Sequence, residues 1–197
     1  SGMSLTSSPA NGTKSVNIQA TADETLIGNV NVVDAEYFIG TVGADGDGTP
    51  MNLNRTAPIS SLSAQIDAAT IQGMTPGDYT IFIHALDELG NWGGFGTINL
   101  KVDKVGPAST GVSLAPNPNN GTLTVNSSSS GVRMEIQMVD ADGSTIKNAE
   151  GFIDYVDATT NPDGTGFPLI AKDALYDSSS ESAYFIIPLA TVRNMSE

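Results

Sequence analysis

The chain has 197 residues, which suits one large domain or two domains of about 100 residues each. Its 22 acidic and 8 basic side chains give a formal net charge of −14. This charge argues against binding to nucleic acid or to anionic lipid, because both need clustered Lys and Arg. The chain has no cysteine, which excludes disulfide bonds and thiolate metal sites. No apolar run approaches the roughly 20 residues of a membrane helix, so we expect no membrane insertion in this segment.

Apolar residues along the chain are spaced as in β-strands. In residues 97–102, Ile98, Leu100 and Val102 alternate with polar side chains, which is the period of a strand with one buried face. Residues 59–71 come nearest to a helical pattern, but their Ser and Thr content predicts only a short helix or a strand-like crossing segment. Short strands between clusters of Gly, Pro, Asp and Asn predict an all-β sandwich. In the first half of the chain we expect strands at residues 14–21, 35–41, 63–67, 79–87 and 96–103.

The stretch "GMTPGDYTI", residues 73–81, has the pattern of a corner between two sheets. A Pro-Gly turn is followed by Tyr79 at the start of an apolar run. In a tyrosine corner the phenol hydroxyl bonds back to the backbone a few residues upstream. We therefore predict a structural role for Tyr79 rather than a role in binding.

The chain repeats itself. "NGT" at 11–13 recurs 109 positions later, "AEYFIG" at 35–40 recurs 114 positions later as "AEGFID", and "GDGTPM" at 46–51 recurs 118 positions later as "GTGFPL". "AATI" at 68–71 recurs 121 positions later as "LATV". The offset grows steadily, as insertions into loops of the second copy would produce. Four matches in one order predict a tandem repeat.

The two copies predict two tandem domains, residues 1–104 and 105–197, with Pro107 punctuating the chain between them. At an offset of 121, Glu197 aligns with Pro76, so the second copy lacks equivalents of the corner and of the last two strands. We expect the second domain to be truncated at its C-terminus. The alternative is a naturally short domain whose insertions supply the cover. Unpaired strand edges invite a neighbouring repeat, or strand exchange in a homodimer.

Two stretches resemble bacterial and archaeal Ig-like repeats. "GDYTIFIHALDELGNWG" followed by "VDKVGP" is similar to their closing pattern ALDxxGNxG…VDxxxP, and "AEYFIGTVGADGDGTPM" is similar to their opening pattern AEYFxDxDPGxGxGxP. The resemblance covers nearly all of the first copy and the second copy up to its end, although Gly151 stands where the first copy has Tyr37. It implies two Ig-like or fibronectin-III-like sandwiches that serve as spacer or adhesion modules of a longer secreted or cell-surface protein.

Calcium is the cofactor that the acidic loops suggest. Ca²⁺ takes oxygen ligands from side chains and carbonyls in Gly-rich loops that bend tightly. None of the loops here matches the EF-hand loop. The competing hypothesis is turn chemistry, because Asp-Gly and Asn-Gly pairs favour tight turns without any metal. The candidate ligands are Asp45, Asp47, Asp87 with its neighbours Glu88 and Asn91, Asp103, Asp140 and Asp142.

Little in the sequence indicates catalysis. The one histidine, His84, stands in mid-strand, and no motif places a Ser or Cys partner near it. We expect a half-buried strand residue rather than a general base. No P-loop, HExxH motif or nucleophile elbow occurs. Trp92, flanked by glycines with Phe95 close by, is either a platform for a sugar or a cap over the end of the sandwich, and the usual burial of large aromatics favours the cap.

These observations predict a non-catalytic extracellular module, a spacer, adhesion or surface-display segment of a larger protein. The expected partners are neighbouring repeats of the parent chain and a surface polysaccharide or protein ligand. The alternatives are a carbohydrate-binding module and an accessory region of a secreted hydrolase. Sites that permit N-glycosylation lie at Asn11, Asn54, Asn120, Asn126 and Asn194.

Overall fold

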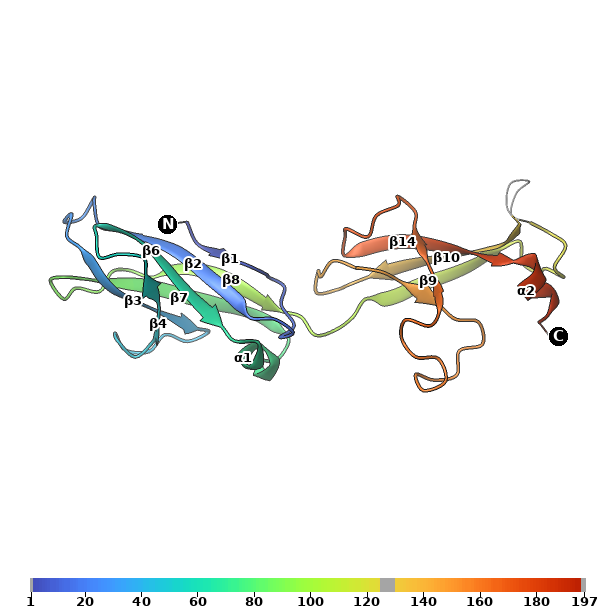
Figure 1. Ribbon diagram of the computed structural model, residues 1–197, viewed down its shortest axis with the longest axis horizontal. Helices are drawn as coiled ribbons and strands as arrows, with labels where there is room; N and C mark the ends of the chain where they lie inside the picture. Colours follow the sequence, from blue (N-terminus) through green and yellow to red (C-terminus); the bar gives the residue numbers. More distant parts are fainter. Residues whose placement is uncertain (1, 125–129, 196–197) are drawn as a thin grey trace. The chain divides into compact units, whose positions relative to one another are not determined.

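The computed structural model describes residues 2–124 and 130–195, so the glycosylation site at Asn126 lies outside the described residues. The chain divides into two compact units, unit 1 (residues 1–104) and unit 2 (residues 105–197), which are described separately (Figure 1). Almost all regular structure is β-strand in antiparallel sheets, which confirms the all-β prediction. Of the two short helices in the described residues, neither is long and apolar enough to span a membrane.

The elements of unit 1 are β1 (Ser4–Leu5), β2 (Val16–Asp23), β3 (Val32–Ile39), β4 (Thr49–Pro50), β5 (Asn52–Leu53), β6 (Ile59–Ile66), α1 (Ala68–Gly73), β7 (Gly77–Asp87) and β8 (Gly96–Val102). Those of unit 2 are β9 (Ala108–Ala115), β10 (Gly131–Val139), β11 (Glu150–Gly151), β12 (Phe167–Pro168), β13 (Ile170–Ala171), β14 (Ser180–Pro188) and α2 (Leu189–Arg193).

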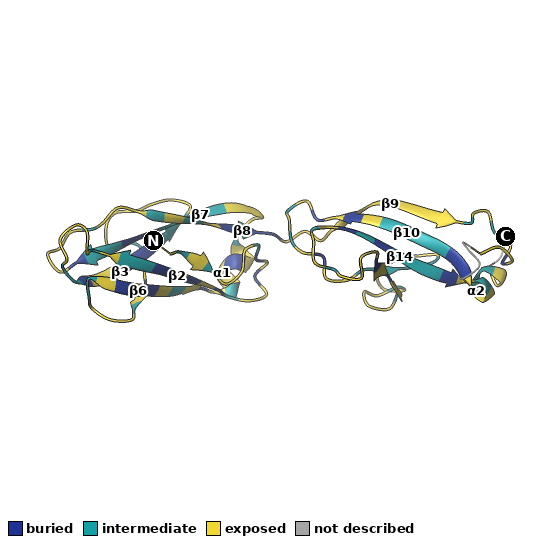
Figure 2. Cartoon of the chain, turned by 90° about the horizontal axis from the view of Figure 1, so that it is seen from above, coloured by how far each residue is buried: buried dark blue, intermediate teal, exposed yellow. Residues whose placement is uncertain are grey.

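Unit 1 has two four-stranded sheets, with strand orders β1-β2-β6-β5 and β4-β3-β7-β8. Strands β2 and β6 alternate between buried apolar and exposed polar residues, so each presents one apolar face. Ile18 of the first sheet and Ile81, Ile83 and Leu100 of the second belong to one buried cluster. The core of unit 1 therefore lies between its two sheets (Figure 2).

Strand β6 is longer than the sequence pattern indicated. We predicted a strand at 63–67, whereas β6 begins at Ile59. The buried Ser60 lies in this early part, and its hydroxyl donates to the backbone oxygen of Arg55 at 2.6 Å. A serine can be buried when its hydroxyl bonds to backbone. Because Ser60 is polar, the sequence pattern did not mark its position as part of the buried face of a strand. Helix α1 follows β6, as a short helix in agreement with its weak pattern.

Unit 2 has one four-stranded sheet, β13-β14-β10-β9, and the two-stranded sheet β11-β12. Within residues 130–195, no strand follows α2, and β11 is hydrogen-bonded on one side only, to β12. The buried apolar cluster of unit 2 contains four residues, Met138, Ile146, Leu169 and Ala183. The cluster of unit 1 contains fourteen buried residues, so the described core of unit 2 is the smaller one.

The two units share strand pairings. Val16 pairs with Ile66 between β2 and β6, and Val132 pairs with Ile187 between β10 and β14. Val132 lies 116 positions after Val16, and Ile187 lies 121 positions after Ile66. The offset of 121 is the one at which "AATI" recurs as "LATV". In the other sheets, Glu36 pairs with Pro50 and Glu150 pairs with Pro168.

Candidate functional site

A buried hydrogen bond between Glu36 and His84, the Glu36–His84 pair, lies on the outer face of the β4-β3-β7-β8 sheet. Ala35 and Tyr37 point into the core of unit 1, so Glu36 between them points to the opposite face. Glu36 is the direct cross-strand neighbour of His84 on β7. The Glu36 Oε1 and His84 Nε2 atoms are 2.7 Å apart, and the side chains are 4% and 1% exposed.

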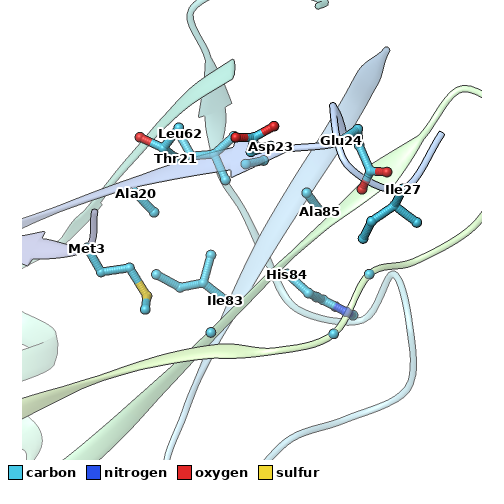
Figure 3. A pocket seen from close by; sticks show the side chains of 14 residues that line it. Met3, Ala20, Thr21, Asp23, Glu24, Ile27, Leu62, Ile83, His84 and Ala85 are labelled. Atoms are coloured by element: carbon cyan, nitrogen blue, oxygen red, sulfur yellow. The ribbon is translucent and has the colours of Figure 1, made fainter. Parts of the chain in front are cut away.

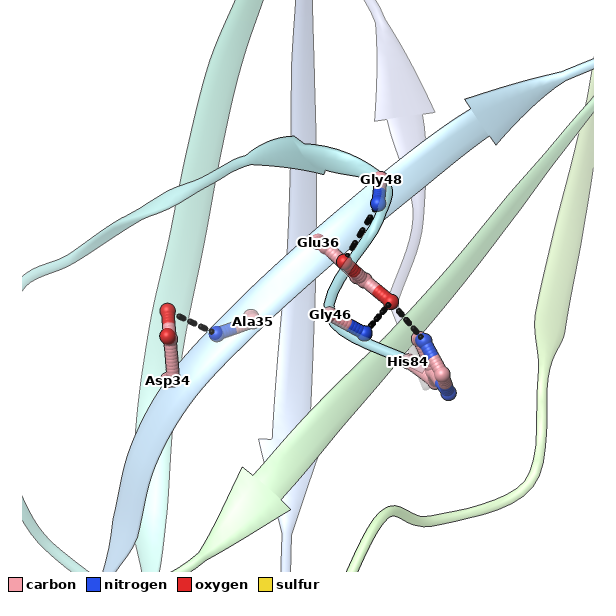
Figure 4. Close-up of polar contacts among 6 residues, drawn as sticks. All are labelled: Asp34, Ala35, Glu36, Gly46, Gly48 and His84. Atoms are coloured by element: carbon pink, nitrogen blue, oxygen red, sulfur yellow. Dashed lines mark hydrogen bonds and ion pairs between the residues drawn. The ribbon is translucent and has the colours of Figure 1, made fainter. Parts of the chain in front are cut away.

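The Glu36 carboxylate also holds the loop between β3 and β4. The Gly46 N–H donates to Oε1 at 2.9 Å and the Gly48 N–H donates to Oε2 at 2.7 Å (Figure 4). Burial acts to raise the pKa of Glu36, but hydrogen bonds from His84, Gly46 and Gly48 outweigh it and hold the pKa below the ordinary value. An ionised carboxylate only accepts hydrogen bonds, so the hydrogen in the Glu36–His84 contact is carried by Nε2 of the imidazole.

Aromatic rings shield this pair from water. The His84 ring stacks against Trp92 and Phe95, with ring centroids 4.3 Å and 4.1 Å apart. Phe38 and Phe82, from β3 and β7, each contact Phe95 edge-on at 6.1 Å. Trp92 is half-buried, whereas Phe95 is 41% exposed. Trp92 therefore lies over His84, and Phe95 forms the exposed part of the cluster.

Unit 2 contains the same glutamate-held loop without the histidine. The Gly164 N–H donates to Glu150 Oε1 at 2.8 Å and the Gly166 N–H donates to Oε2 at 2.7 Å. Gly46 and its counterpart Gly164 have φ angles of 85° and 84°, a region that favours glycine. The same carboxylate geometry thus holds the equivalent loop in both units.

The glycines after these turns leave no room for a side chain. A Cβ atom at Gly48 would lie 2.8 Å from Glu36 Oε2, and one at Gly166 would lie 2.9 Å from Glu150 Oε2. We expect Gly48→Ala to lower the free energy of unfolding of unit 1 by about 2 kcal/mol, measured by thermal unfolding. Gly94→Ala, where a Cβ would meet nothing within 4 Å, is the control and should change it by less than about 0.5 kcal/mol. Equal effects of the two variants would contradict this account of the loop.

A cavity of about 220 Å³ in unit 1 is lined by residues of both sheets, among them His84 (Figure 3). Its lining includes the apolar side chains of Met3, Leu62 and Ile83, and the acidic residues Asp23 and Glu24. A hydrogen bond from the Thr25 hydroxyl, at 2.6 Å, lowers the pKa of Asp23. That carboxylate therefore shapes its own loop.

The candidate calcium ligands lie in separate loops. Asp87 and Asp140 accept hydrogen bonds from backbone N–H groups two and four residues later, which is turn chemistry. The side-chain hydrogen bond from Asn91 is the largest cause that lowers the pKa of Asp87. Asp45 and Asp47 are exposed. Asp103 is buried and donates its N–H to Ala10 O at 3.0 Å. The turn that follows Asp87 contains Glu88 and Asn91, and the turn that follows Asp140 contains Asp142.

Over residues 2–124 and 130–195, no group of three or more His, Cys, Asp or Glu side chains is placed to hold a metal ion. Calcium binding stays a prediction. A melting temperature that falls by several degrees on chelation would support it.

The Tyr79 hydroxyl lies 3.0 Å from the backbone oxygen of Thr75, to which it donates. This is the backbone hydrogen bond expected of a structural corner. His84 is more deeply buried than the half-buried strand residue that we expected, because Trp92 and Phe95 cover it. Trp92 stacks on His84 at the outer face of the sheet, and its role as a cap over the end of the sandwich stays a prediction.

Sequence reasoning missed the two glutamates. A signal was present, because the Glu of "AEYF" recurs as Glu150 in "AEGF", and a Gly-x-Gly follows each of them in the next loop. A carboxylate that recurs together with a glycine loop indicates an acceptor for that loop's N–H groups.

Comparisons with models of protein families, with curated proteins and with solved structures found no match to this chain. The resemblance to Ig-like repeats therefore rests on the residues themselves.

Proposed function

We propose that the chain is a non-catalytic structural segment of a secreted or cell-surface protein, formed by two copies of one Ig-like unit. The observation that carries this proposal is the glutamate-held loop. Glu36 and Glu150 each accept hydrogen bonds from two glycine N–H groups of their own unit, at corresponding positions of the two copies. The most deeply buried carboxylate, Glu36, thus serves the architecture of its own unit, which is the property of a spacer rather than of a reaction site.

The topology of unit 1 supports the Ig-like part of the proposal. When its eight strands are lettered A, B, C, C′, D, E, F and G in chain order, the sheets have the orders A-B-E-D and C′-C-F-G. Immunoglobulin-type sandwiches divide their strands between two sheets in this way. Unit 2 supplies counterparts of A, B, C, C′, D and E within its described residues.

The location is tested on intact cells that produce the protein. Protease added outside should cleave the chain while a cytosolic marker in the same cells stays whole. Cleavage that occurs only after the cells are lysed would contradict a place at the cell surface. Recovery of the chain from the culture medium would support the secreted form of the proposal.

The carbohydrate-binding alternative is favoured by one observation, the exposed Phe95 among Phe38, Phe82 and Trp92. Exposed aromatic faces stack on ligand rings. Phe95 is 41% exposed whereas the other three rings are half-buried, so Phe95 has the surface that could meet a sugar. Retention of the chain on a polysaccharide would favour this alternative, and a hydrolase domain in the parent protein would favour an accessory role.

A further inference from the structure

The outer face of the β1-β2-β6-β5 sheet of unit 1 carries amide and hydroxyl side chains. Strands β2 and β6 alternate between buried and exposed residues, and the exposed ones point away from the core (Figure 2). Across these strands, Asn17 pairs with Gln65 and Gln19 pairs with Ser63. Ser63 also pairs with Asn52 of β5. The register therefore places uncharged polar side chains of three strands side by side on one exposed surface.

Two adjoining hollows lie on this surface. One has a volume of about 310 Å³ and reaches Asn17, and the other has a volume of about 360 Å³ and reaches Asn54. Gln19 and Ser63 line both hollows, so they stand between them. At one end, Gln65 Nε2 donates to Asn17 Oδ1 at 3.0 Å. This bond fixes two amides against each other and leaves each with a further N–H donor for a ligand.

The fold does not require amides on this face. Unit 2 has the same strand pairings, and at four amide positions of unit 1 it carries charged or apolar residues. In chain order, Asn17 corresponds to Arg133, Gln19 to Glu135, Asn52 to Ile170 and Asn54 to Lys172. Glu135 and Lys172 form an ion pair at 2.8 Å. Since the same pairings form with these side chains, the amides of unit 1 are not a condition of its fold.

The chemistry of this surface selects an uncharged ligand that is rich in hydroxyl groups. Among the described residues that line the two hollows none is charged, although the chain has 22 acidic and 8 basic side chains. A charged ligand would lose water here without gaining an opposite charge. Amide and hydroxyl side chains both donate and accept hydrogen bonds, and so does each hydroxyl of a sugar. Two adjoining hollows of similar size suit two successive rings of one sugar chain.

We propose that unit 1 binds a linear, uncharged polysaccharide across β2, β5 and β6. Gln19 and Ser63 contact two successive sugar rings, one in each hollow. Because these groups lie on strands rather than on loops, their spacing is fixed before the ligand binds. The site is separate from Phe95, which contacts Phe38 and Phe82 on the outer face of the other sheet. The proposal adds a ligand to the structural role proposed above and does not depend on the location of the protein.

The test titrates the whole isotope-labelled chain with uncharged hexasaccharides of glucose, mannose, xylose and N-acetylglucosamine, followed by nuclear magnetic resonance. A hexamer of galacturonic acid is the charged control. We expect at least one of the uncharged hexasaccharides to shift the backbone amide resonances of β2, β5 and β6 in a saturable way. The charged hexamer should shift none of them, because its carboxylates meet no cation on this surface.

Two variants that exchange an amide for a carboxylate give a matched comparison. Gln19→Glu introduces the residue type that unit 2 has at this position, and it should weaken binding at least about tenfold. Asn99→Asp makes the same chemical change on the outer face of the other sheet and should leave binding unchanged. Both side chains are exposed, so both variants should fold, which the thermal unfolding of unit 1 verifies.

Three outcomes would overturn the proposal. The first is the absence of saturable shifts with every uncharged hexasaccharide, and the second is equal weakening of binding by both variants. The third is a set of shifts confined to the surroundings of Phe95, which would place the sugar on the other sheet. None of these outcomes bears on the protease test of location, so the two proposals fail separately.

Discussion

Glu36→Ala is expected to lower the free energy of unfolding of unit 1 by about 3 kcal/mol, because it leaves a buried histidine and two loop N–H groups without their acceptor. For a domain of this size, that loss corresponds to a fall in melting temperature on the order of 15 °C. Trp92 is the only tryptophan of the chain, and it stacks on His84, so its fluorescence reports the unfolding of unit 1 alone.

The matched variant is Glu150→Ala in unit 2. It removes the acceptor of two glycine N–H groups, but Glu150 is half-buried and serves no histidine, so we expect a loss of about 1 kcal/mol. Hydrogen exchange of the amides of β14 follows the stability of unit 2. A smaller effect of Glu36→Ala than of Glu150→Ala would show that the histidine contributes nothing.

Acid should weaken unit 1 through the same carboxylate. The pKa of Glu36 is lowered in the folded unit relative to the unfolded chain, where a glutamate titrates near about 4.3. Its contribution is therefore fully present above that pH and is lost as the pH falls through the folded pKa. As the pH is lowered through that range, the free energy of unfolding of the original chain should decrease more steeply than that of the Glu36→Gln variant. Parallel curves would contradict this assignment.

Ile18→Ala is expected to lower the free energy of unfolding of unit 1 by about 4 kcal/mol. The Ile18 side chain is fully buried between the sheets, so its truncation leaves a cavity among side chains of β2, β6 and β7. Urea denaturation followed by Trp92 fluorescence measures the change.

Met134→Ala is the counterpart in unit 2, and we expect a loss of only about 1 kcal/mol. Met134 pairs with Phe185 as Ile18 pairs with Ala64, but it is half-buried, and no strand among residues 105–124 and 130–195 covers it as β7 covers Ile18. Hydrogen exchange at β10 measures this change. Similar losses for both variants would mean that the two cores are equally well covered.

Several features of this protein follow from the sequence by itself. Alternation such as that of Ile98, Leu100 and Val102 is a property of neighbouring residues, so it indicates strands without knowledge of their partners. The Pro-Gly turn before Tyr79 is equally local, and the all-β class follows from many such short signals. The steady offset between matching stretches predicted the repeat, because insertions displace a pattern without erasing it.

The contact between Glu36 and His84 follows from the tertiary structure alone. Glu36 and His84 are 48 positions apart, and only the register of β3 against β7 makes them neighbours. Burial of the pair depends on Trp92 and Phe95, which a loop after β7 folds back over it. The exposure of Leu114 and Val112 could not be predicted from the sequence either. An apolar residue in a strand gives the same sequence pattern whether or not a second sheet covers it. Local patterns specify which face of a strand is apolar, and only long-range pairing specifies what that face meets.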